Sequence, residues 1–309
     1  MKRTRSRLIA GSMLLGLIVL GSAITWIISA PRSRLTHSDL VLLERPGDPE
    51  KGRLVFTAAD CASCHASPGQ PERTHLGGGL ALASPFGTFH VPNISPDPQD
   101  GIGKWRTRDL ADALLSGVSP SGEHYYPALP YTSYAMMTIE DVRNLMAYLL
   151  TLPRVSGTPS PHELTFPFDV RRLVGLWKLI FFHPRRSESA SEPLNSLNRG
   201  RYLVEVLGHC AECHSPRNLL GGIKRGTRFA GGADPEGVGF APNITPAGIG
   251  GWSKDEIIAT LTDRRTPAFR VIGSSMADVV TDISQLSRSD QEAIASYLKT
   301  LPARPTPSP

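Results

Sequence analysis

Two Cys-x-x-Cys-His pentapeptides, at residues 61–65 and 210–214, constrain this chain more than any other feature. Together they contain all four of its cysteines. This spacing is typical of covalent attachment of a c-type haem, in which two thiols form thioethers with the haem vinyl groups. The histidine that follows is then the proximal ligand of the iron. We therefore predict two covalently attached haem c groups, held by Cys61, Cys64, His65, Cys210, Cys213 and His214.

A zinc site is the alternative interpretation of the same cysteines. A structural zinc ion takes four ligands in a tetrahedron, so the four thiols could together form one all-thiolate site. The histidine that ends each pentapeptide would then have no role. This favours haem over zinc.

The positive charge of the chain is concentrated at its N-terminus. The whole chain has a net charge of +5, and residues 1–34 contain six basic residues and no acidic one. Residues 35–309 therefore carry a net charge of −1, which is the difference between +5 and +6. A basic footprint for nucleic acid is absent from the body of the chain, so we expect no nucleic-acid partner.

The segment Leu8–Ile28 is an uncharged, mostly apolar run of 21 residues. At ~1.5 Å per residue such a helix is long enough to span a bilayer, and the cationic residues before it favour the cytoplasm. Cleavage as a signal peptide is disfavoured because apolar residues 24–28 or Pro31 would follow the cut. We expect residues 1–30 to stay as a cytoplasmic stub and transmembrane anchor in the inner membrane, with the bulk of the chain in the periplasm.

The two halves of the chain repeat each other beyond the cysteine motifs. Four separated motifs recur at offsets of 147–150 residues, which indicates a duplicated domain of about 105 residues. The motifs are the pentapeptides, Pro-Asn-Ile-Ser/Thr-Pro at 92–96 and 242–246, Gly-Ile-Gly-x-Trp at 101–105 and 248–252, and Tyr-Leu-x-Thr-Leu-Pro at 148–153 and 297–302. We expect the Pro-Asn-Ile-Ser/Thr-Pro loops to be turns with no chemistry of their own.

Each repeat is predicted to open and close with a helix. Asp48 can cap the first opening helix, and Thr138 and Ser287 precede acidic residues in the pattern of a capping box at the start of the closing helices. The small Gly52 and Gly200 would let each opening helix approach its closing helix. Tyr148 and Tyr297 would then supply the bulky side of each contact.

Both repeats resemble class I cytochrome c domains. Residues 47–303 are similar to the cytochrome subunits of membrane-bound bacterial alcohol, gluconate and related sugar or aldehyde dehydrogenases. The resemblance rests on the motifs above, on residues 126–134 and on residues 166–182. Those subunits usually carry three haem motifs, whereas this chain has two, so the resemblance does not extend to a third haem or to direct transfer of electrons to quinone.

The expected fold is all-α, with an N-terminal transmembrane helix followed by two tandem cytochrome c domains. The expected segments are 1–30 for the anchor, 47–153 and 196–303 for the two domains, 154–195 for a connector and 304–309 for a Pro-rich tail. The apolar and basic connector is interpreted as packing between the domains, with a dehydrogenase-docking or membrane-surface element as the alternative. Residues 187–195 are expected to be a polar linker.

Methionines are the expected distal ligands of the two irons, because a thioether raises the haem potential. Met276 is the only methionine after Met146 and lies in a polar loop, so it is the candidate in the second repeat. In the first repeat the resemblance places the ligand at Met137, directly before Thr138, with Met136 as the alternative. His90 and His124 are further alternatives, and Trp105 and Trp252 could donate to haem propionates.

The predicted function is electron transfer, with no enzymatic site. Electrons would come from a periplasmic or membrane-bound dehydrogenase and pass through the respiratory chain to quinone, an oxidase or another cytochrome. The sequence has no nucleotide-binding glycine fingerprint. The alternative is a haem enzyme, such as a diheme peroxidase or a thiosulfate-oxidising cytochrome. A methionine candidate in each repeat disfavours it, because a peroxidase needs a haem whose sixth position can open.

Overall fold

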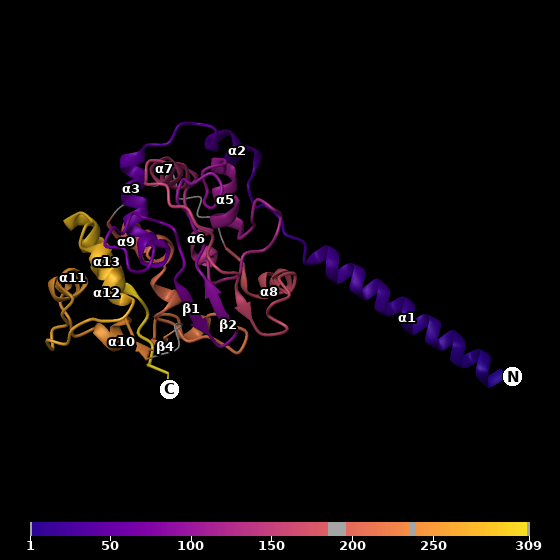
Figure 1. Ribbon diagram of the computed structural model, residues 1–309. Helices are drawn as coiled ribbons and strands as arrows, with labels where there is room; N and C mark the ends of the chain where they lie inside the picture. The colour runs from indigo at the N-terminus through magenta and orange to yellow at the C-terminus, as the bar shows by residue number, and fades with distance from the viewer. Residues whose placement is uncertain (1, 185–195, 235–238, 308–309) are drawn as a thin grey trace.

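The computed structural model describes residues 2–184, 196–234 and 239–307, and side chains from residue 13 onward. The predicted polar linker at 187–195 lies outside these residues. A long helix, α1 (Lys2–Ile28), projects from a body that holds both repeats (Figure 1). The elements of the first repeat are α2 (His37–Leu43), α3 (Pro49–Ala58), α4 (Cys61–His65), α5 (Thr107–Ser116), α6 (Tyr131–Tyr134) and α7 (Ile139–Leu149).

The second repeat follows the connector helix α8 (Leu173–Phe181) and has a corresponding order of elements. Its opening helix α9 (Ser196–Tyr202) continues into one wider turn, η2 (Leu203–Leu207). The remaining helical elements are η3 (Cys210–Glu212), η4 (Arg225–Thr227), α10 (Pro246–Ile249), α11 (Lys254–Asp263), α12 (Met276–Ile283) and α13 (Arg288–Thr300).

Local capping sets the start of several helices, as the sequence predicts. The Asp48 carboxylate accepts from the backbone N–H groups of the first turn of α3. Thr138 and Ser287 each accept from the backbone N–H three residues later, at the starts of α7 and α13. Each cap satisfies an N–H group that has no partner inside its helix, so the three predicted helix starts are confirmed.

One glycine in each repeat lets the opening and closing helices come into direct contact. A Cβ atom on Gly52 would lie 2.0 Å from the carbonyl oxygen of Asn144 and 2.7 Å from the Cβ of Tyr148. A Cβ atom on Gly200 would lie 2.0 Å from the carbonyl oxygen of Ala293 and 2.9 Å from the Cβ of Tyr297. The predicted glycine–tyrosine contacts are therefore confirmed, and the two helix pairs, α3 with α7 and α9 with α13, pack closely.

The prediction of an all-α fold is wrong, because both repeats contain short strands. Strands β1 (Ala81–Ser84) and β2 (Gly87–His90) form an antiparallel hairpin with Ala81 opposite His90, and β3 (Glu163–Leu164) pairs with β2. In the second repeat β4 (Gly232–Ala233) pairs with β5 (Phe240–Ala241). These strands are two to four residues long, which is too short for a clear alternating pattern in the sequence.

The prediction of a transmembrane helix is also wrong. A membrane-spanning helix needs about 20 consecutive, mostly apolar residues. Within residues 2–184, 196–234 and 239–307, no helix combines the length and the apolar character that crossing a bilayer requires. The expectations of an anchor at residues 1–30 and of a single-pass location in the inner membrane are corrected accordingly.

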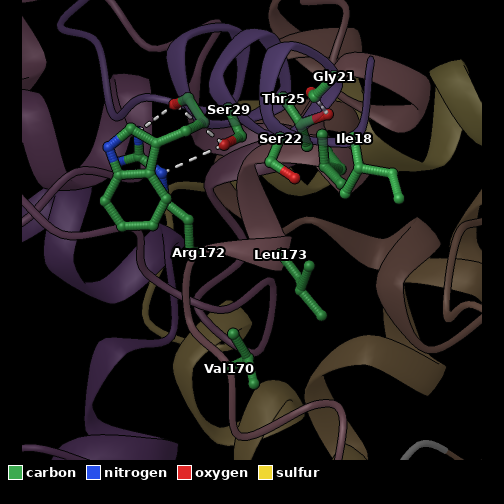
Figure 2. Close-up of a pocket in the computed structure, with 10 residues that line it drawn as sticks. Ile18, Gly21, Ser22, Thr25, Ser29, Val170, Arg172 and Leu173 are labelled. Atoms are coloured by element: carbon green, nitrogen blue, oxygen red, sulfur yellow. Dashed lines mark hydrogen bonds between the residues drawn. The ribbon is translucent and has the colours of Figure 1, made fainter. Parts of the chain in front are cut away.

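The end of α1 lies against the connector. Arg172 donates through Nε to Ser29 Oγ (3.2 Å) and through its terminal nitrogen to the carbonyl of Trp26 (Figure 2). A hollow of ≈ 480 Å³ lies between these segments, and Arg172 is the only ionisable residue in its lining. No residue of either cysteine motif lines it, so the chemistry of the chain lies elsewhere.

The two repeats contact each other through the same elements on both sides. Helix α6 of the first repeat packs on η2 of the second, and α12 of the second packs on α3 of the first. The elements α3 and η2, which occupy the same place in their repeats, also touch. One continuous hydrophobic core results, and it includes Val55, Leu145, Val204 and Ile294.

Candidate haem sites

Each cysteine motif begins at a residue in the left-handed backbone conformation. Asp60 has φ 51° and precedes α4, and His209 has φ 34° and precedes η3. Non-glycine residues adopt this conformation rarely, and it recurs at functional sites. The sharp turn starts a short helical segment in which the two cysteines and the histidine follow one another at the same spacing in both repeats.

The proximal histidines are oriented by backbone carbonyls. His65 Nδ1 lies 2.9 Å from the carbonyl oxygen of Pro92, and His214 Nδ1 lies 2.7 Å from that of Pro242. A carbonyl oxygen only accepts, so Nδ1 carries the proton and Nε2 is left as the nitrogen with a lone pair. Metal-bound histidines are commonly fixed in this way. The expectation that the Pro-Asn-Ile-Ser/Thr-Pro loops have no chemical role missed this function.

Buried asparagines hold these two loops in place. Asn93 donates to the carbonyl of Val155 (2.7 Å), and Asn243 donates to the carbonyl of Arg304 (2.8 Å). The side-chain oxygen of each asparagine accepts from the backbone N–H two residues later. Segments just beyond each closing helix therefore support the loop that orients each histidine, although the sequence interpretation placed them in the connector and the tail.

The titratable groups of both motifs fit a covalently attached, histidine-ligated haem. Burial lowers the pKa of His65 and of His214, so both imidazoles are neutral and able to bind a metal. Burial also raises the pKa of the Cys61 thiol and raises that of Cys210 to about 12. In the part of the chain that the structure describes, no three His, Cys, Asp or Glu side chains gather as a metal site. The alternative of one four-thiolate zinc site is therefore not supported.

The candidate distal methionines occupy different places in the two repeats. Met137 is 4% exposed and directly precedes the cap of α7, whereas Met276 is half-buried and is the first residue of α12. At the offset that relates Thr138 to Ser287, the residue matching Met137 is the buried Leu286. Both methionines and the neighbouring Met136 pack against the common core. The first repeat therefore offers two adjacent thioether candidates and the second repeat offers one, from different positions.

The other sequence candidates have different surroundings. His90 Nε2 lies 3.2 Å from a carboxylate oxygen of Glu163, and His124 Nε2 lies 2.8 Å from the carbonyl oxygen of Ser29. Those contacts engage both imidazoles away from the cysteine motifs. Trp105 and Trp252 are half-buried against the common core at matching places in the two repeats.

The two cysteine motifs adjoin each other across the contact between the repeats. Ala59 lies two residues before the first motif, and His209 directly precedes the second. Tyr134 bridges them: its hydroxyl donates to the carbonyl of Ala59 (3.2 Å), and its ring lies 5.4 Å from that of His209. The attachment points of the two haems are therefore close in space, which suits passage of electrons between them.

A residue inside the second motif helps to hold the two repeats together. Glu212 accepts from the hydroxyl of Thr132 (2.7 Å) and from that of Ser133 (3.3 Å) in the first repeat. Arg217 donates to its other carboxylate oxygen (2.7 Å). Although burial opposes ionisation, the charge of Arg217 and the hydroxyl of Thr132 lower the pKa of Glu212, which therefore stays ionised.

A matching contact lies beside the first motif. Arg73 pairs with Asp282 of α12 (2.6 Å) and lies 3.6 Å from the buried Asp60. Burial, together with the neighbouring Asp282, raises the pKa of Asp60 to about 8. Sequence reasoning missed these contacts, because nothing in a local pattern joins residues that are about 80 or 209 positions apart.

Comparisons with known proteins agree with this geometry. Residues 49–153 match the family model for cytochrome c. The chain is 46% identical over 305 residues to a diheme cytochrome c-type protein of Cereibacter sphaeroides, covering 97% of this chain and 99% of that protein. It is 36% identical to the fructose dehydrogenase cytochrome subunit of Gluconobacter japonicus and 34% identical to the gluconate 2-dehydrogenase cytochrome c subunit of Pantoea cypripedii. These matches cover 82% of this chain but only 52% and 60% of those two subunits.

Proposed function

Because the chain belongs to the family of diheme c-type cytochromes, we propose that it is an electron-transfer subunit that accepts electrons from a partner dehydrogenase and passes them to a further electron acceptor. One observation carries this proposal: each repeat holds a histidine whose Nδ1 is fixed on a proline carbonyl beside its cysteine pair. Relatives named as dehydrogenase cytochrome subunits support the kind of electron donor. This is a relay role, without an enzymatic site of its own.

The residues of the chain would hold two haems at fixed positions. Cys61, Cys64, Cys210 and Cys213 would attach them, with His65 and His214 as proximal ligands. When bound, each haem c supplies one-electron exchange between ferric and ferrous iron, so two haems together take the two electrons that a dehydrogenase removes from one substrate molecule. The contacts of Tyr134 with Ala59 and His209 keep the two sites adjacent.

We further propose Met137 and Met276 as the distal ligands. Replacing Met276 with Ala is expected to lower the potential of one haem by on the order of 100 mV, because axial ligation moves haem potentials over about 0.8 V. The ferric charge-transfer band of methionine-ligated haem should lose about half its intensity, and Met137→Ala should affect the other haem in the same way. Redox titration with spectroscopy measures both changes. Met136→Ala is the matched control and should leave both potentials in place; a shift there instead would assign the first ligand to Met136.

The proposed function is tested with purified catalytic subunits of fructose, alcohol, gluconate and nicotinate dehydrogenases, the activities named for the relatives. Each is mixed with its substrate and the ferric protein, and haem reduction is followed in the visible spectrum. We expect at least one of them to reduce both haems, and we expect the protein alone to be inert towards peroxide and thiosulfate. Turnover of either compound, or binding of carbon monoxide to the ferrous protein, would indicate a haem enzyme instead.

A further inference from the structure

A hairpin of the second repeat, Arg264–Ile272, has a counterpart in the first repeat at Gly117–Tyr125. Both follow a helix whose C-terminal cap is left-handed, with φ 61° at Gly117 and 58° at Arg264. Three backbone hydrogen bonds recur at an offset of 147 residues, the difference between 264 and 117. They are Ser119 to Glu123, Gly122 to Ser119 and Tyr125 to Gly117 in the first hairpin, and Thr266 to Arg270, Phe269 to Thr266 and Ile272 to Arg264 in the second.

The base of the first hairpin is covered by other parts of the chain, whereas its tip, residues 120–123, is exposed. Its paired residues Val118 and His124 are 9% and 3% exposed. The carbonyl of His124 accepts from Arg171 (3.0 Å), and the carbonyl of Gly117 accepts from Lys178 of α8 (2.7 Å). The connector therefore packs on this surface, and Arg171 and Lys178 of the connector bind to the backbone of the first hairpin.

The second hairpin is not covered by the described chain, and its surface is apolar and basic. Phe269 is 82% exposed, and Val271, which matches the buried His124, is 74% exposed. Arg270, between them in the chain, and Arg265, which pairs with Val271, are also exposed. Aromatic residues and arginines are the side chains that most often anchor protein–protein contacts.

The backbone at Phe269 shows that this exposed side chain is held in an unfavourable conformation. Phe269 has φ 59°, and the matching residue of the first hairpin is Gly122 with φ 76°. Glycine adopts a positive φ without strain, whereas a bulky side chain there is an outlier that is concentrated at functional sites. An exposed phenylalanine gains no burial to offset this strain within the chain, so its packing partner is expected to lie outside it.

The hairpin is fixed to the part of the second repeat that begins with Met276. Arg264 donates to the carbonyl of Ala277 (2.7 Å) and to the hydroxyl of Thr281 (3.2 Å), both in α12. Figure 1 shows α11 and α12, which the hairpin joins, on the side of the body opposite α1. A protein seated on the hairpin would therefore lie beside the proposed second haem site.

We propose that the hairpin Arg264–Ile272 docks the catalytic subunit of the partner dehydrogenase, a protein face with an apolar hollow bordered by carboxylates. Phe269 and Val271 fill the hollow, and Arg265 and Arg270 pair with the carboxylates. This inference rests on the proposed function. It places the entry point for electrons at the second repeat: each electron leaves the reduced cofactor of the dehydrogenase and converts one ferric haem to ferrous.

The test introduces the residues of the covered hairpin into the exposed one. Phe269→Gly and Arg270→Glu are made singly in the full-length holoprotein, and reduction is measured with the dehydrogenase subunit that reduces the wild type most rapidly. The second-order rate constant should fall at least about tenfold in each variant.

The wild-type rate constant should also fall as ionic strength rises from about 10 mM to about 300 mM, and Arg270→Glu should weaken that dependence. Haem content and the rate of reduction by ascorbate should stay unchanged, as they should in the matched control Glu123→Gln.

Several outcomes would overturn the inference. Rate constants within about twofold of the wild type in both variants would show that the hairpin does not dock the dehydrogenase. Loss of binding to phosphatidylglycerol vesicles, with unchanged reduction, would assign the hairpin to a lipid surface. A wild-type dimer in sedimentation velocity that Phe269→Gly dissociates would assign it to a second copy of the chain. If none of the dehydrogenases reduces the wild-type protein, both the proposed function and the docking inference fail. If the wild type is reduced and both variants keep its rate constant, only the docking inference fails.

Discussion

Replacing both cysteines of the second motif, as Cys210→Ala with Cys213→Ala, is expected to halve the covalent haem content from two groups per chain to one. Each motif supplies its own pair of thiols and its own histidine, fixed on Pro92 or Pro242, so attachment at the first motif does not need the second. Pyridine haemochrome analysis and intact mass measure the number of haems. The redox titration should then show one remaining one-electron wave.

The complementary variant, Cys61→Ala with Cys64→Ala, is the matched control and should remove the other haem. Two haems remaining after either double replacement would contradict covalent attachment at that motif. A complete loss of haem from one double variant would show that the intact motif cannot attach haem when the other motif is empty. The shared core of the two repeats would explain such a dependence.

Replacing Gly200 with Ala is expected to destabilise the second repeat by about 3 kcal/mol, because the new Cβ atom would overlap a backbone carbonyl of α13. The helices α9 and α13 would have to separate along their contact. In thermal unfolding this corresponds to a fall in Tm of roughly 6–12 °C. Gly52→Ala should have a similar effect on α3 and α7, since its Cβ atom would lie equally close to the carbonyl of Asn144.

Gly251→Ala is the control for both glycine variants. A Cβ atom on Gly251 meets no other atom within 4 Å, so its effect should stay within about 0.5 kcal/mol. An equal Tm for Gly200→Ala and Gly251→Ala would show that the close helix contact is not needed for stability.

Short local patterns explain which parts of the fold the sequence could predict. The cap at Asp48 and the contacts of Gly52 and Gly200 follow from residue types that each have a narrow structural use. The glycine also recurs at the same place in both repeats, which strengthened that prediction. The strands escaped prediction because β1 and β2 are four residues each and lie in a Gly-rich stretch that has no clear alternation. The apolar run before Ser29 indicated a membrane-spanning helix. The helices that the structure describes do not support this prediction.

The candidate sites were predictable only where side chains carry the chemistry. The cysteines and histidines of both motifs are visible in the sequence, whereas the carbonyl of Pro92 or Pro242 belongs to the backbone and has no signature of its own. The recurrence of the same loop in both repeats was the available signal. The pairing of Glu212 with Thr132 depends on how the repeats pack, which no local pattern records.

The contact between the repeats is reciprocal: α6 packs on η2, α12 packs on α3, and α3 and η2 touch each other. In an isologous contact of this kind each partner uses the same face, so the pair closes on itself. A further copy of the same domain could not join by repeating this contact and would have to bind on a different surface.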